Sequence, residues 1–164
     1  MKMNSELARI AKIEANKHYH GNVMSSKINL QPIANLFPYS DTWTIDSWDN
    51  VWCAAFVYHC VKLFGYDLPV RFPDDRVTMS FAGVPAWEQW AKLPEVLKWV
   101  EKDKTPHKGD IVLFRKVFDG KEPDHIGIVI DISETWIQSA EGNFSNVSAI
   151  VQRPYECVYG YIRL

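Results

Sequence analysis

The stretch that decides the fold lies at residues 51–64 and reads VWCAAFVYHCVKLF. Asp49 and Asn50 precede it and Gly65 follows it, and these residue types often begin and end helices. Apolar residues occupy most of the positions, so the segment has almost no polar face. The sequence therefore predicts a helix over residues 51–64 that is buried on nearly all sides.

Two further helices are predicted, one on each side of this segment. The first is capped at Asn4 or Ser5 and runs to about Tyr19. The second covers residues 85–102 and is broken at Pro94, because proline lacks the backbone N–H that a helix interior needs.

From His107 onward the pattern changes to short β-rich runs separated by turn residues. The predicted strands are residues 110–114, 125–132, 135–140, 147–151 and 158–162. Helices followed by an antiparallel sheet indicate the α+β fold class. We expect one domain over residues 1–164, made of an N-terminal helix with a long loop (1–50, including a helical turn near 33–37), helices (51–104) and the sheet (105–164).

Composition and charge exclude several classes of protein. The chain is 47% hydrophobic and 23% charged, which is typical of globular proteins, and its net charge of −2 gives no electrostatic basis for binding nucleic acid. No window is long enough for a transmembrane helix, and charged residues interrupt residues 1–13 where a signal peptide would lie. We expect a protein made in the cytoplasm with no nucleic-acid partner and no membrane segment; if it acts outside the cell, a non-classical route carries it there.

The three cysteines are too few and too irregularly spaced for a disulfide framework. Neither CxxC nor HExxH occurs, so we expect no metal and no other cofactor. Asp46 and Asp49 in the long loop are the candidates if a calcium site exists.

Cys53 is the candidate nucleophile, because it lies in the first turn of the predicted buried helix. Unpaired backbone N–H groups and the helix dipole favour an anion there, which suits a reactive thiolate. The alternative is that Cys53 is a small buried apolar residue, as most free cysteines are. Cys60 and Cys157 lack this position and are expected to be packing residues.

His125 and the Glu141–Asn143 segment supply the other candidate site residues. His125 begins an apolar strand and could direct its imidazole at a thiol, although a water-facing edge histidine is the alternative. Glu141 and Asn143 close the next predicted strand, where either could fix the imidazole tautomer, although the same residues also suit an ordinary turn. The order of cysteine, histidine and acid or amide favours a catalytic site over chance.

Several short motifs in this order resemble those of the CHAP family, the cysteine- and histidine-dependent amidohydrolase/peptidases. They are WCAAFV (52–57), KGDIVLF (108–114), DHIGIV (124–129), AEGN (140–143) and YGYIR (159–163). The resemblance runs from about Trp52 to the C-terminus.

This resemblance implies a papain-like fold and hydrolysis of amide bonds in peptidoglycan or another peptide substrate. Cys53 would attack the carbonyl, His125 would act as base and then as acid, Glu141 would orient His125, and Asn143 would be a second polar partner. The Cys53 backbone N–H and one further donor would hold the oxyanion. Two alternatives remain: a papain-like hydrolase of another amide substrate, and a non-catalytic binding module that retains the fold.

Overall fold

Helices precede strands along the chain in the computed structural model, which describes residues 2–23, 27–37, 51–118 and 120–164. The helices are α1 (Lys2–Ala15), α2 (Gln31–Ala34), α3 (Cys53–Leu63) and α4 (Val84–Ala91). The strands are β1 (Trp99–Glu101), β2 (Ile111–Phe114), β3 (His125–Ile132), β4 (Trp136–Phe144), β5 (Val147–Pro154) and β6 (Val158–Ile162), with a 3-10 turn at Tyr155–Cys157.

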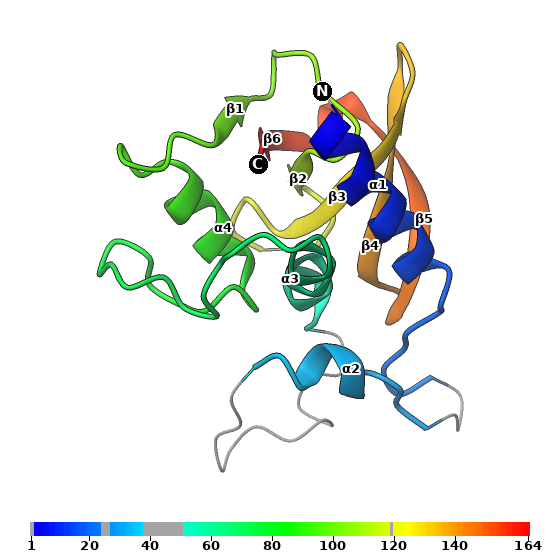
Figure 1. The fold of residues 1–164 in the computed structure, drawn as a ribbon. Coiled ribbons are helices and arrows are strands. Elements are labelled where there is room, and N and C mark those ends of the chain that lie inside the picture. The colour runs from blue at the N-terminus through cyan, green and yellow to red at the C-terminus, as the bar shows by residue number, and fades with distance from the viewer. Residues whose placement is uncertain (1, 24–26, 38–50, 119) are drawn as a thin grey trace.

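The strands form one six-stranded sheet in the order β1-β6-β2-β3-β4-β5, and each neighbouring pair is antiparallel. Helices α1 and α3 pack against each other and against β3 and β4. In Figure 1, α1 crosses in front of the sheet, and α3 is seen almost end-on below β3. N-terminal helices on a C-terminal antiparallel sheet confirm the predicted α+β, papain-like class.

Strand β2 shows how the sheet separates two apolar clusters. All four of its residues are buried. Because side chains alternate along a strand, Ile111 and Leu113 join the core shared with the helices, while Val112 and Phe114 join a second cluster on the opposite face. The second cluster consists of Val112, Phe114, Val129, Ile137, Val158 and Tyr161. Burial on both faces explains the uninterrupted apolar sequence of β2.

The central helix is buried as predicted but begins later. Helix α3 starts at Cys53, with Trp52 as the preceding N-cap residue at φ −119°, and Val51 is 60% exposed. The Trp52 ring is fully buried and donates from Nε1 to Asn146 Oδ1 at 2.9 Å. The buried Trp52 is thus the last residue before helix α3, and Cys53 is the first residue of the helix. The predicted capping residues, Asp49 and Asn50, lie outside the described residues.

The first helix is shorter than predicted at its C-terminal end and begins earlier. It spans Lys2–Ala15. His18 takes a left-handed conformation at φ 53°, and Tyr19 then bonds its backbone N–H to Ser148 Oγ and its hydroxyl to Glu14. These contacts draw Tyr19 out of the helical path, so the prediction of a helix to Tyr19 was wrong. The helical turn predicted at 33–37 is found at Gln31–Ala34.

The prediction of a broken helix over residues 85–102 was partly wrong. Helix α4 covers Val84–Ala91, but residues 99–101 form the edge strand β1, which pairs with β6. Gly160 of β6 lacks a side chain where the Trp99 ring packs. Strands β3 and β6 have the predicted bounds. In the part of the chain that the structure describes, no helix combines the length and apolar character needed to cross a membrane.

Candidate active site

Cys53 is the first residue of α3, and its side chain is 8% exposed. The backbone N–H groups of a first helical turn have no partner inside the helix, and the helix dipole places partial positive charge there. The end of strand β4 packs closely against this turn, because a Cβ on Gly142 would collide with Phe56 and lie 2.9 Å from the Trp52 ring. Glycine therefore brings β4 and the start of α3 together.

His125 begins β3 and is fully buried. Its ring stacks on Phe114, with centroids 6.1 Å apart, and meets Phe118 edge-on at 5.3 Å. Phe114 comes from the partner position on β2, so the strand register places the two rings together. The alternative of a water-facing edge histidine does not hold.

Glu141 lies on β4 and is also fully buried. Its Oε2 is 2.7 Å from His125 Nε2. Gly127, two residues after His125, makes room for this contact, because a Cβ there would lie 2.9 Å from Glu141 Cγ and 3.0 Å from the Ala140 carbonyl oxygen. Glu141 lies inside the strand, which continues to Phe144, and not in a closing turn.

The Cys53 thiol interacts with the same imidazole. Burial lowers the pKa of His125, but the neighbouring Cys53 and Glu141 outweigh burial and raise the pKa of His125 to about 9. Nε2 faces Glu141, and the buried Nδ1 makes no hydrogen bond of normal geometry with the described residues. Nδ1 is therefore the ring nitrogen that Glu141 leaves open for an interaction with the Cys53 sulfur.

Two residues that the sequence did not single out also contact Glu141. Arg153 of β5 donates from Nε to Oε1 and from Nη2 to Oε2, both at 2.7 Å, and Ser139 Oγ donates to Oε1 at 2.6 Å. Burial raises the pKa of Glu141, but the hydrogen bonds from Arg153 and His125 outweigh it and lower that pKa. The only sequence signal for Ser139 is its alternation with Glu141 on one strand, and no local pattern marks Arg153.

Asn143 lies near this group in a different backbone conformation. It is buried and left-handed at φ 59°, at the irregularity between Glu141 and Phe144 where the pairing of β4 with β5 shifts. The other candidate for contacting the imidazole, Glu141, hydrogen-bonds to His125.

The remaining cysteines occupy different settings. Cys60 is fully buried in the middle of α3, and burial raises its pKa well above the ordinary value. Cys157 is partly buried in the 3-10 turn that precedes β6. His59, beside Cys60, is buried and pairs with Glu14 at 3.0 Å, so it faces a partner in the core.

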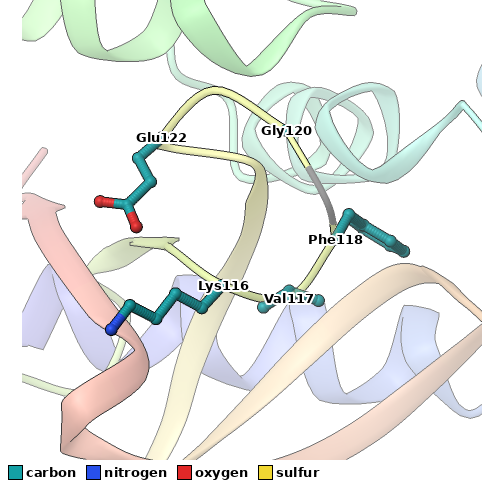
Figure 2. Close-up of a pocket in the computed structure, with 5 residues that line it drawn as sticks. All are labelled: Lys116, Val117, Phe118, Gly120 and Glu122. Carbon is teal, nitrogen blue, oxygen red and sulfur yellow. The ribbon is translucent and has the colours of Figure 1, made fainter.

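A hollow of about 510 Å³ opens beside the site, at the loop between β2 and β3. Figure 2 shows Lys116 and Glu122 pointing to one side of this loop and Phe118 to the other. The Phe118 ring, 48% exposed, contacts His125 on its inner side. Asp124 fixes the loop next to His125 by accepting hydrogen bonds from the backbone of Val117 and Phe118.

Within the described ranges, no group of three or more His, Cys, Asp or Glu side chains is arranged to hold a metal ion. Asp46 and Asp49, the candidates for calcium, fall outside those ranges.

Comparison with known proteins gives one match. The family described as the CHAP domain matches residues 45–143, more than half of the chain. The matched region contains Cys53, His125, Glu141 and Asn143. No curated protein and no solved structure matches the chain. On this match the chain belongs to the CHAP family, which consists of hydrolases of the amidase and peptidase type.

Proposed function

We propose that this protein hydrolyses amide bonds in peptidoglycan, with Cys53 as nucleophile and His125 as its base. One observation carries the proposal: His125 hydrogen-bonds to the buried Glu141 through Nε2, its other nitrogen makes no hydrogen bond with the described residues, and the Cys53 thiol interacts with the ring. A thiol at a helix start beside an oriented imidazole is the arrangement that nucleophilic catalysis needs.

The reaction follows from these positions. His125 accepts the Cys53 proton, and the thiolate sulfur attacks the carbonyl carbon of the amide. The resulting oxyanion is stabilised by the backbone N–H of Cys53 and a second donor. His125 then gives its proton to the amine nitrogen, the C–N bond breaks, and a thioester remains on Cys53. Water, deprotonated by His125, attacks the thioester and releases the acid and the free thiol.

Glu141 supports His125 in both half-reactions. Its carboxylate accepts the Nε2–H, which leaves Nδ1 to exchange protons with sulfur, amine and water. Asn143 is proposed as a further polar group of the site, since it is buried two residues after Glu141.

Peptidoglycan is proposed as substrate because of the family and of the setting beside His125. Lys116 and Glu122 place opposite charges at the adjacent hollow, and Phe118 offers an apolar surface next to the imidazole. Stem peptides carry carboxylates, amines and short apolar side chains that fit such a surface. A papain-like hydrolase of another amide substrate would share the chemistry but not this target.

Incubation of purified peptidoglycan with the protein tests the proposal. New amino groups should appear without new reducing sugar ends, and Cys53→Ala should lose at least about 10³-fold in rate, as expected when a nucleophile is removed. Cys60→Ala is the matched control on the same helix and should keep the activity, since Cys60 lies away from the site.

Retained turnover in Cys53→Ala would contradict the mechanism. Hydrolysis of a simple peptide amide but not of peptidoglycan would contradict the substrate and favour the other hydrolase. Binding to peptidoglycan with no turnover of either substrate would favour a non-catalytic module.

A further inference from the structure

The carboxylate of Glu141 has a full set of hydrogen-bond donors. Its Oε1 accepts from Ser139 Oγ at 2.6 Å and from Arg153 Nε at 2.7 Å. Its Oε2 accepts from His125 Nε2 and from Arg153 Nη2, both at 2.7 Å. A carboxylate has about four lone-pair positions, so these bonds fix one orientation of the group. Arg153 supplies half of them and bridges both oxygens.

Arg153 is itself held in place. It lies on the edge strand β5, yet its side chain is only 13% exposed. Its guanidinium carbon lies 5.0 Å from the centre of the Phe114 ring, and that ring also stacks on His125. One aromatic side chain therefore supports both cationic partners of Glu141. A planar guanidinium between a ring and a carboxylate is a pre-organised fork that lysine cannot reproduce.

We propose that Arg153 is a positioning residue, which fixes the Glu141 carboxylate in its charged form on His125 and so directs the free imidazole nitrogen at Cys53. The inference rests on the proposed function, since it gives Arg153 a role in the same reaction. In this role Arg153 acts through Glu141 and not by direct contact with Cys53 or the substrate.

Charge is the physical reason for an arginine at this position. A buried carboxylate without a cation tends to take up a proton. For Glu141, burial acts to raise the pKa, and the hydrogen bonds from Arg153 and His125 reverse this effect. A neutral carboxyl group would no longer stabilise a protonated imidazole. Several ionisable groups influence the Glu141–His125 pair. Arg153 and His125 act on Glu141, and Cys53 acts on His125. Asp124 and Cys157 act in turn on Arg153.

The test follows the titration of the His125 imidazole by NMR in the intact protein, which needs no substrate. The variants are Arg153→Gln, Arg153→Lys, Glu141→Gln and the double variant Arg153→Gln with Glu141→Gln. In Arg153→Gln the acidic step, at which Glu141 gains its proton beside His125, should move up by about one pH unit or more. Arg153→Lys keeps the positive charge but loses the two-point hydrogen bonding of the guanidinium. The acidic step of the His125 titration should therefore stay near its original pH.

Arg163→Gln is the matched control. Arg163 donates two hydrogen bonds, of 2.9 and 2.7 Å, to the carboxylate of the buried Asp110, which lies outside the site. This variant should lose stability as Arg153→Gln does and leave the His125 titration unchanged. A purely structural role for Arg153 would make the two variants alike.

Kinetics provide the second readout. Arg153→Lys should lower kcat by about tenfold or more through misplaced geometry, with KM little changed. In the Glu141→Gln background, Arg153→Gln should add almost nothing, because the residue acts through that carboxylate.

An acidic step that stays in place in folded Arg153→Gln, or full additivity in the double variant, would overturn the inference. Loss of turnover in Cys53→Ala bears on the proposed function alone, whereas the NMR titration bears on Arg153 alone.

Discussion

His125 lies entirely inside the protein, and its two partners decide whether it is charged. Burial lowers its pKa, but Cys53 and Glu141 raise it from 6.5 to about 9. A raised pKa means that the protonated ring is stabilised by folding. This contribution is complete below pH 6.5 and is lost as the pH rises through about 9. The raised pKa therefore favours the protonated imidazole of His125 throughout the neutral range.

Replacing Glu141 by Gln removes the charge that favours the imidazolium. Burial is then less opposed, so the high-pH limb of kcat/KM should move to lower pH. The rate at neutral pH should fall by about 10²-fold, less than in Cys53→Ala, because nucleophile and base remain. A pH–rate profile measures both effects. An unmoved limb would contradict the role given to Glu141, and a loss equal to that of Cys53→Ala would mean that its carboxylate does more than orient.

Among the secondary-structure elements, the close packing of the end of β4 against the start of α3 depends on Gly142. A methyl group there would collide with Phe56 and approach the Trp52 ring at 2.9 Å. Gly142→Ala should therefore lower the free energy of unfolding by about 1–3 kcal/mol, as overpacking does, and lower the rate by displacing Cys53 from His125.

Gly120→Ala is the control for that variant, because a Cβ at Gly120 would meet no atom of the described residues within 4 Å, its chain neighbours aside. Urea unfolding and turnover should be almost unchanged in the control. Equal stability of Gly142→Ala and Gly120→Ala would show that the close packing at α3 is not needed.

The sequence predicted those elements whose signals are local. The bounds of β3 and β6 follow from short apolar runs between turn residues, and Cys53, His125 and Glu141 follow from motif order. The sequence predicts helix at the edge strand β1 because its partner strand, β6, lies about sixty residues further along the chain. Arg153 was missed for the same physical reason: its bond to Glu141 depends on the pairing of β4 with β5, which no local pattern reveals.

Across the whole molecule, a buried hydrogen-bond network joins helix α1 to helix α3. Glu14 accepts hydrogen bonds from Lys17, Tyr19 and His59, and it is almost fully buried. Burial raises the pKa of Glu14, but these donors outweigh it and lower that pKa. The stability gained is therefore present above pH 4.5 and is lost as the pH falls through the lowered value.

Glu14→Ala should lower the free energy of unfolding by about 3 kcal/mol, because it leaves buried partners unpaired. Its stability should also depend less on acid pH than that of the unchanged protein. Glu6→Ala on the same helix removes only an exposed pair with Arg9 and should leave the urea midpoint nearly unchanged. Similar midpoints for the two variants would contradict a role for this network in holding the helices together.

If His125 activates Cys53, the three thiols of the folded protein should differ in reactivity. The folded protein is treated with a small alkylating agent at mildly acidic pH, where an ordinary thiol is almost wholly protonated. Peptide mapping by mass spectrometry then follows Cys53, Cys60 and Cys157 together. We expect Cys53 to be labelled first, labelling to track the loss of activity, and His125→Ala to slow the labelling. If Cys60 or Cys157 reacts as fast as Cys53, or if His125→Ala leaves the labelling rate unchanged, Cys53 is an ordinary buried thiol that His125 does not activate.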